Sequence, residues 1–346
     1  MKSRTIYIIA GLLLFAVLIT ASVFALRYYN YIYSPNSVAE CEIFIQTEAE
    51  FQDVKKEFEE AGCLNNLAGF EWVADRMNYA GSRIIPGRYV IRKGLTNRQI
   101  IQKLRSGEQD AVNVIIPSAR DLRLVAKRAA TNIEPDSQAI AQYIFSESLQ
   151  EDFGLDPTGL KNRIIPNTYK MWWNSDPKAL VSRLMREYEH FWNQNERLQK
   201  AEKLGLSREE VIILASIVDR ETNYVPEMPK IAGVYLNRLE SNWPLQADPT
   251  VVFALGNPEV RRVLNRDLEV DSPYNTYKHT GLPPGPISIP PIAAIDAVLN
   301  PEQHDYYYFC AKPGNSGKHA FSRTLNEHLR NARKFQNWLN QQRIMR

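Results

Sequence analysis

The sequence predicts an α+β protein that consists of an N-terminal transmembrane helix, a small α+β module and a helix-rich C-terminal domain with Pro/Gly-rich loops. Residues 5–26 form an uncharged apolar run, strand and helix patterns alternate between residues 34 and 110, and helix patterns dominate from residue 111 onward. We therefore expect a tail, anchor and joint at residues 1–33, the module at 34–110 and the larger domain at 111–346.

The apolar run at residues 5–26 determines the expected compartment. Its 22 residues could cross the hydrocarbon core of a bilayer as a helix. Lys2 and Arg4 precede it, which predicts a cytoplasmic tail and places the remaining chain on the periplasmic or extracellular side of the cell (inner) membrane. A cleaved signal peptide is the alternative, but its apolar core normally has only about 7–15 residues. The length therefore favours an uncleaved, single-pass anchor.

The module should contain two strands and three helices and carries no cluster of catalytic residue types. We interpret it as a binding or spacing module, and a purely structural subdomain is the alternative. The expected elements are strands at Cys41–Gln46 and within Pro86–Ile91, and helices at Ala49–Ala61, Leu67–Met77 and Thr96–Leu104.

Composition excludes several classes of function. The formal net charge is +3 and no long Lys/Arg block occurs, so nucleic-acid binding is not expected. The three cysteines are widely spaced and the five histidines form no two-ligand motif, so no metal site is expected. Glycine loops for phosphates or dinucleotides are missing, and no cofactor is predicted. Cys41 and Cys63 could pair outside the cytoplasm, which the sequence leaves open.

The C-terminal domain combines a helical frame with a long loop segment. Residues 244–291 are dense in Pro, Gly, Asn and Tyr, and loops carried on a rigid frame are where sites are usually built. The frame is expected to consist of a strand at Val112–Ile116 and helices at Arg120–Ala130, Gln138–Leu149, Ala179–Leu204, Ser207–Thr222 and Glu227–Leu239.

Glu221 is the strongest catalytic candidate. It ends the helix that Ser207 begins, with Glu210 as the capping-box partner of Ser207. A carboxyl that ends an apolar helix face should be partly desolvated, which raises its pKa and keeps it protonated as a general acid requires. The alternative is a glutamate at a helix end that turns back to solvent. Helical periodicity places Glu221 on one face with Leu214, Ile217 and Val218, and places Asp219 on the opposite side.

Several further segments have residue types that suit a carbohydrate. Aromatic rings offer an apolar face with a polar edge, and amide and hydroxyl groups exchange hydrogen bonds without adding charge. Taken singly, each segment is equally typical of a turn or of core packing. The candidate substrate-binding residues are Asn167, Tyr169, Gln246, Asp248, Thr250, Tyr274, Asn275, Thr276, Tyr277, His319 and Ser322.

Together, these motifs resemble those of the YceG/MltG-type endolytic murein transglycosylases. The resemblance is dense from about residue 207 to 328 and looser from residue 160. Two departures are Asp219, where many members have Glu, and Ile289-Pro290-Pro291, where Asn or Thr, Pro and Gly are common. The matching segments are Pro166–Tyr169, Ile213–Thr222, Ile231–Leu239, Leu245–Thr250, Tyr274–Tyr277, Gly281–Ile287 and His319–Ser322, the last followed by Glu327-His328.

The resemblance implies a membrane-anchored enzyme that cuts within peptidoglycan glycan strands. Such enzymes cleave the β-1,4 bond between N-acetylmuramic acid (MurNAc) and N-acetylglucosamine (GlcNAc) without water and leave 1,6-anhydroMurNAc ends. Glu221 would be the catalytic residue, and residues 34–110 would form a LysM-like module. The resemblance also implies action on nascent strands, which limits their length, and coupling to peptidoglycan synthases.

The expected chemistry needs one carboxyl group. Glu221 would protonate the leaving oxygen and then take the proton of the C6 hydroxyl that attacks C1 of the same sugar, so proximity replaces a second carboxylate. Two alternatives stay open. Glu221 and Asp248 could form the carboxylate pair of a muramidase-type hydrolase, or the chain could be a non-catalytic glycan-binding scaffold.

Overall fold

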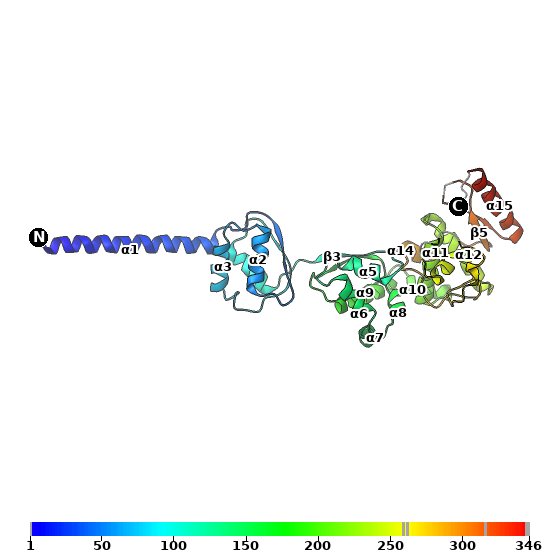
Figure 1. Ribbon diagram of the computed structural model, residues 1–346, viewed down its shortest axis with the longest axis horizontal. Coiled ribbons are helices and arrows are strands. Elements are labelled where there is room, and N and C mark those ends of the chain that lie inside the picture. Colours follow the sequence, from blue (N-terminus) through cyan, green and yellow to red (C-terminus); the bar gives the residue numbers. More distant parts are fainter. Residues whose placement is uncertain (1, 258–259, 261–262, 315–316, 343–346) are drawn as a thin grey trace. The chain divides into compact units, whose positions relative to one another are not determined.

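The computed structural model describes residues 2–257, 260, 263–314 and 317–342, and side chains from residue 7 onward (Figure 1). The chain divides into two compact units. The first comprises residues up to Asn113 together with 132–134 and 170–175, and the second comprises residues 114–131, 135–169 and the chain from Asp176 onward. The sequence predicts this boundary after residue 110, whereas the structure has it after Asn113. The structure also assigns the segments 132–134 and 170–175 to the first unit.

Helix α1 (Lys2–Tyr33) continues beyond the expected apolar span. Its segment Tyr7–Tyr33 has 27 residues and a mean hydropathy of 2.7, which makes it long and apolar enough to cross a membrane. The last turns pack on the module: the Tyr28 ring stacks on Trp72 with centroids 4.5 Å apart, and Asn97 Nδ2 donates to the Tyr31 carbonyl oxygen at 2.9 Å. The apolar helix therefore enters the module without a break.

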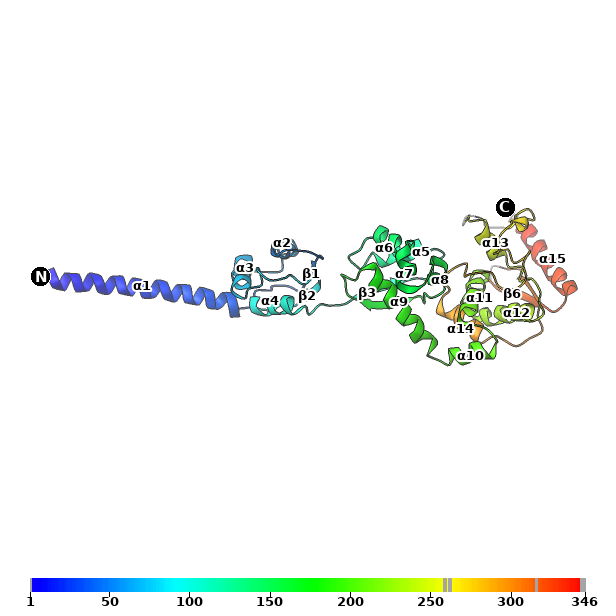
Figure 2. The same cartoon turned by 90° about the horizontal axis from the view of Figure 1, so that it is seen from below.

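The module has the predicted order of strands and helices. Its two strands are antiparallel, and Ile43 and Tyr89 lie opposite each other in the buried core. Cys41 and Cys63, whose pairing the sequence left open, form a disulfide with Cα atoms 6.1 Å apart. The elements are β1 (Cys41–Ile45), α2 (Phe51–Ala61), α3 (Leu67–Arg76), β2 (Gly87–Ile91) and α4 (Asn97–Ser106) (Figure 2).

Two of the helices predicted after residue 111 are each interrupted. The helix expected at Gln138–Leu149 is two helices, because Phe145 ends one and Ser146 begins the next. The long helix expected at Ala179–Leu204 also breaks, where Asn195 and Glu196 adopt φ values of 55° and 58°. The elements here are β3 (Val112–Ile116), α5 (Leu122–Ala129), α6 (Ser137–Ile144), α7 (Glu147–Phe153), α8 (Pro157–Lys161), β4 (Asn167–Met171), α9 (Pro177–Trp192) and α10 (Arg197–Lys203); β3 pairs with β4.

The second of these breaks has a tertiary cause. Arg197 Nε donates to Asp296 Oδ1 at 2.8 Å, and the guanidinium lies 3.8 Å from the centroid of the Phe191 ring. The Arg197 side chain is only 6 % exposed, so the pair anchors α10 beside α14 (Ile292–Leu299). A continuous helix would place Arg197 away from Asp296. The helical periodicity of the sequence gives no information about this contact, because the two residues are far apart in the chain.

Helix α11 (Arg208–Glu221) is the centre of the second unit. Its predicted capping box is present, since the Ser207 side chain accepts from the Glu210 amide and the Glu210 side chain accepts from the Ser207 amide. The sequence predicted one apolar face, but every residue from Val211 to Val218 is buried. Helices α12 (Met228–Glu240), α13 (Asp248–Ala254) and α14 all pack against it (Figures 1 and 2).

The Pro-rich loop is attached to α11 at Ser216. Ser216 Oγ donates to the Ile213 carbonyl oxygen at 2.7 Å and accepts from the Ile287 amide at 3.0 Å. Two residues later, the Ile289 amide donates to the Ala119 carbonyl oxygen at 2.7 Å. The segment 244–291 is thus bound to the helical frame, and it contains the helix α13, which the sequence analysis treated as loop.

The chain after α14 completes the unit. Strands β5 and β6 pair as an antiparallel hairpin with Phe309 opposite Phe321, and the last helix packs against both strands. The remaining elements are the 3-10 turns η1 (Val225–Glu227) and η2 (Asp267–Glu269), β5 (Tyr308–Ala311), β6 (His319–Ser322) and α15 (Leu325–Gln341).

We expect Ser216→Ala to weaken the attachment of the Pro-rich loop. The substitution leaves the buried Ile287 amide without its acceptor, which should cost about 1–3 kcal/mol. Urea unfolding of the detergent-solubilised chain and hydrogen exchange at the Ile287 amide measure the effect. The exposed Ser137→Ala is the control and should stay within about 0.5 kcal/mol of the unaltered chain. Unchanged exchange at Ile287 would contradict the assigned role of Ser216.

Candidate active site

Glu221 lies at the C-terminal end of α11, where a tyrosine of the neighbouring helix holds its carboxyl group. The Tyr235 hydroxyl, on α12, donates to Glu221 Oε1 at 2.6 Å. Burial raises the pKa of the Glu221 carboxyl to about 7, against the opposing effect of the Tyr235 hydrogen bond; the nearby Asp248 charge raises it further and Arg238 lowers it. A large fraction of Glu221 is therefore protonated near neutral pH, as the sequence predicted.

Asp248 forms a second carboxyl–tyrosine pair. It is the first residue of α13, and its Oδ1 accepts a hydrogen bond from the Tyr277 hydroxyl at 2.6 Å. Burial and the Asp248 carboxylate both raise the pKa of Tyr277, so the phenol stays protonated and remains a donor. Each carboxyl group thus has one oxygen oriented by a phenol, and among the described residues the second oxygen of each accepts no hydrogen bond.

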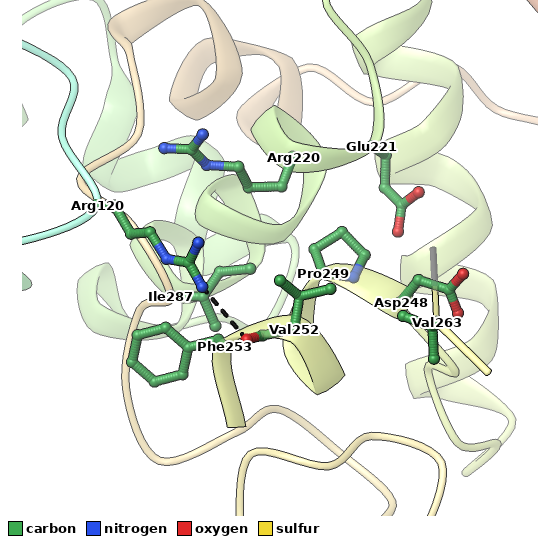
Figure 3. Close-up of a pocket in the computed structure, with 9 residues that line it drawn as sticks. All are labelled: Arg120, Arg220, Glu221, Asp248, Pro249, Val252, Phe253, Val263 and Ile287. Carbon is green, nitrogen blue, oxygen red and sulfur yellow. Dashed lines mark hydrogen bonds between the residues drawn. The ribbon is translucent and has the colours of Figure 1, made fainter. Parts of the chain in front are cut away.

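Two pockets meet at these carboxyl groups. Glu221 and Asp248 line a pocket of about 360 Å³ that extends toward Arg120, Arg220 and Phe253 (Figure 3). The same two residues line another pocket, of about 310 Å³, whose other lining residues include Tyr235, Arg238, Gln246, Tyr277 and Tyr308. A linear polymer that occupies both pockets would place one of its internal bonds beside the carboxyl groups.

Three more of the predicted binding residues lie at these pockets or directly beside them. Gln246 and Tyr277 line the second pocket. Gln246 has a φ of 48°, and its amide donates to the Thr276 carbonyl oxygen at 3.0 Å, which joins the two loop segments. The Tyr274 ring packs on Phe253, a lining residue of the first pocket, with centroids 4.7 Å apart.

Three predicted binding residues support the loops instead. Thr250, Asn275 and Thr276 are all at most 2 % exposed. The two threonine hydroxyls lie 2.8 Å apart, and Asn275 Nδ2 donates to the carbonyl oxygens of Leu268 and Val270 at 2.8 Å each. Because they are buried and bonded within the protein, these residues shape the loop that carries Tyr277.

Four others do not line the two pockets. Asn167 is exposed at the start of β4, whereas Tyr169 is buried and its hydroxyl donates to the Ile165 carbonyl oxygen. His319 Nδ1 lies 3.1 Å from Glu227 Oε2. Ser322 is buried, and its Oγ accepts from Asn331 Nδ2 at 3.0 Å. The structure therefore does not bring these residues to the carboxyl pair.

Several residues of the site carry no signal in the sequence that would assign them to it. Tyr235 belongs to Ile231–Leu239, one of the segments on which the family resemblance rests, but the sequence assigns no role to Tyr235 itself. Its contact with Glu221 crosses between two helices, so the periodicity of either helix gives no signal for it. Arg120 is about a hundred positions upstream of Glu221, and only the tertiary fold brings it to the same pocket.

Within the part of the chain that the structure describes, no three His, Cys, Asp or Glu side chains are grouped so that they could hold a metal ion. The chemical groups at the pocket junction are therefore the two carboxyls, their two phenols and the nearby guanidinium of Arg238. This set can give and accept protons, and its carboxyl groups can stabilise positive charge that develops on a bound ligand.

Comparison with known proteins agrees with this architecture. Residues 43–334 match the model of the YceG-like family. The chain is 34 % identical over 266 residues to a Bacillus subtilis (strain 168) protein named endolytic murein transglycosylase, with 72 % of each chain covered. It is 25 % identical over 329 residues to a protein of the same name from Streptococcus pneumoniae serotype 2, which covers 86 % of this chain and 58 % of that protein.

A solved structure shows the same fold. The crystal structure of a YceG-like protein from Listeria monocytogenes superposes with a TM-score of 0.54 at 25 % identity, and covers 84 % of this chain and 98 % of that one. The fold and the site define a helix-rich protein with a raised-pKa carboxyl at the junction of two pockets. The chain belongs to the YceG-like family.

We expect Glu221→Gln to stabilise the protein at alkaline pH. The native carboxyl has a pKa of about 7 against an ordinary value of 4.5, so the native state retains a proton that the unfolded chain releases. The free energy of unfolding therefore falls as pH rises from about 4.5 to 7, and Gln removes this loss. At pH 8 the variant should be more stable by up to about 3 kcal/mol, and at pH 4 by almost nothing.

Urea unfolding at both pH values measures this difference. Glu240→Gln is the matched control, because Glu240 is exposed and its substitution should change stability by no more than about 0.5 kcal/mol at either pH. An equal effect of Glu221→Gln at pH 4 and pH 8 would show that the Glu221 carboxyl is not held in its protonated form.

Proposed function

We propose that this protein is a membrane-anchored endolytic lytic transglycosylase, which cleaves the MurNAc–GlcNAc β-1,4 bond within peptidoglycan strands and leaves 1,6-anhydroMurNAc ends. The observation that carries the proposal is the position of Glu221. Its carboxyl, with a pKa of about 7, lies where two pockets meet. An enzyme that cuts inside a strand needs room for sugars on both sides of its acid, and this arrangement provides it.

In the proposed reaction, Glu221 first acts as an acid. Its proton passes to the glycosidic oxygen as the bond from that oxygen to C1 of MurNAc breaks, and the GlcNAc hydroxyl leaves. The C6 oxygen of the same MurNAc then bonds to C1, and the C6 hydroxyl proton returns to the Glu221 carboxylate. No water is consumed, and the enzyme ends in its starting protonation state.

The partners of Glu221 have separate parts in this reaction. Tyr235 would hold Oε1, which leaves Oε2 to carry the proton that is transferred. Asp248 would stabilise the oxocarbenium-like positive charge at C1. Gln246, Tyr274 and Tyr277 would position the sugars through hydrogen bonds and ring contacts.

A muramidase-type hydrolase is the second candidate, and the placement of Asp248 favours it. Asp248 lines both pockets with Glu221, so it could activate a water molecule or attack C1 itself. The transglycosylase remains our conclusion because intramolecular attack needs one proton-transferring carboxyl, and because the named relatives are transglycosylases.

Anchoring and cellular role complete the proposal. The apolar segment Tyr7–Tyr33 would cross the cell membrane and keep the enzyme attached to it. The last turns of this helix pack on the module, so the module would lie directly at the membrane surface. The disulfide Cys41–Cys63 agrees with a compartment outside the cytoplasm. We further propose action on nascent strands, which would limit their length, and coupling to peptidoglycan synthases.

Digestion of purified peptidoglycan by the detergent-solubilised protein tests the activity. Mass spectrometry should find anhydro ends from internal cuts, and Glu221→Gln should lower their rate of formation at least about 10³-fold. Asp248→Asn should leave measurable anhydro product. Products heavier by one water that vanish in Asp248→Asn would replace the transglycosylase with the hydrolase. Unaltered cellular effects of Glu221→Gln would instead indicate a scaffold.

The pH dependence of kcat/KM should report the protonation of Glu221. Because the acid form is needed, kcat/KM should fall on the alkaline side with an apparent pKa of about 7. Tyr235→Phe removes a hydrogen bond that lowers this pKa, so the alkaline limb should move to higher pH while kcat falls about tenfold. A loss of rate with an unmoved alkaline limb would mean that Tyr235 serves folding alone.

A further inference from the structure

The pocket of about 360 Å³ beside Glu221 and Asp248 has one positively charged wall, called the cationic wall below. Arg120 and Arg220 line it at the end away from Asp248, and Figure 3 shows both side chains on the same side of the pocket. They are close enough that the charge of Arg220 contributes, after burial, to lowering the pKa of Arg120. The proposed reaction uses neither arginine.

Neither guanidinium is neutralised by a well-placed carboxylate among the described residues. Arg120 Nη2 donates to the Val252 carbonyl oxygen at 3.2 Å. Arg220 has only its sequence neighbour Asp219, with 3.6 Å between Nε and Oδ2, and 42 % of its side chain is exposed. Most of the hydrogen-bond donors of both groups therefore remain available to a ligand.

A third cation lies behind the same wall. Lys161 is 8 % exposed, and its Nζ lies 4.7 Å from the centroid of the Phe253 ring, which also lines the pocket. In the described part of the chain its ammonium has no ion pair within 4.0 Å, although Asp121 is near enough to act on it. The pKa of Lys161 is lowered to about 8, chiefly by burial and to a smaller extent by Arg120 and Arg220, against the opposing effect of Asp121.

Three neighbouring cations are costly to hold together when the nearby carboxylates, Asp219 and Asp121, form no close and well-oriented pair with them. Mutual repulsion and desolvation both disfavour such an arrangement, and both penalties are relieved when a carboxylate enters and binds a guanidinium through two hydrogen bonds. The backbone of the strand is uncharged at the scissile bond, so the anion must come from a substituent of the sugars.

We propose that Arg120 and Arg220, with the buried Lys161 adding positive charge behind them, form an anion subsite, which binds a carboxylate carried by a muramyl residue next to the bond that is cut. This inference rests on the proposed function. Each muramyl residue carries a lactyl group, which ends in a free carboxylate in peptide-free strands and carries a peptide with its own carboxylates in intact ones. Both sources present the same chemistry to the subsite. A polymer of N-acetylglucosamine alone has no such group, so the subsite would also exclude it.

Binding to the Glu221→Gln protein tests the subsite without turnover. The full-length, detergent-solubilised variant is titrated with three soluble glycan probes: strands with peptides, peptide-free strands with free lactyl carboxylates, and peptide-free strands whose lactyl groups are methylamidated. The free lactyl strand should bind at least about 10-fold more tightly than the amidated one at low salt, and added salt should reduce the difference.

Variants in the Glu221→Gln background assign the effect to the cationic wall. Arg120→Gln and Arg220→Gln should each remove most of the preference for the charged strand. Arg220 makes no structural hydrogen bond within the described residues, so its variant remains informative if Arg120→Gln destabilises the fold. Arg128→Gln removes the same charge from the exposed face of the nearby helix α5, and should leave the preference intact.

The outcomes separate the carboxylate sources and the two proposals. Preference only for the peptide-bearing strand, lost in the arginine variants, would place the bound carboxylate in the peptide. Equal binding of all three probes, or an unchanged preference in both arginine variants, would overturn the subsite. Failure of the proposed function appears elsewhere, as products heavier by one water in digestions by the unaltered protein, and the comparison of the probes on the non-cleaving Glu221→Gln variant does not depend on that result.

Discussion

The burial of α11 on all sides is the constraint on which the rest of the structure depends. Because Val211–Val218 are enclosed, the helix cannot rotate or shift without exposing apolar surface, so the residue at its end is fixed in space. That residue is Glu221, whose carboxyl is desolvated by the same packing. The neighbouring helix supplies Tyr235, and the loops attach through Ser216. The fixed position of α11, the raised pKa of the Glu221 carboxyl and the attachment of the Pro-rich loop thus all depend on the packing around this one helix.

The sequence predicts local features well when they depend on neighbours along the chain. The capping box of α11 and the strand and helix order of the module are confirmed, since each follows from residues a few positions apart. The raised pKa of Glu221 is also found, although packing between helices produces it. The breaks between α6 and α7 and between α9 and α10 were missed. The second depends on Arg197 reaching Asp296, about a hundred residues away, and helical periodicity carries no information about such a partner.

In the candidate site, the sequence does not distinguish residues that contact a ligand from residues that support a loop. Motif residues such as Thr250 and Thr276 have the chemistry of sugar contacts, yet they are buried and bond to each other. Hydroxyl and amide groups serve equally well in stabilising a loop and in contacting a ligand, so residue type alone cannot separate the two. Tyr277 and Gln246, from the same segments, do reach a pocket. Only the direction of each side chain distinguishes them, and this direction is a tertiary property.

The bridge between Ile289 and Ala119 has a consequence for how such a cleft can diverge. It links the end of the Pro-rich loop to the residue directly before Arg120. One guanidinium of the cationic wall, that of Arg120, is thus attached to the loop, whereas Arg220 and the acid Glu221 both belong to α11. Changes in the loop can therefore move the Arg120 guanidinium while the proton donor stays in place. Under the proposed function, the part of substrate choice that depends on Arg120 would be mechanically separable from bond cleavage.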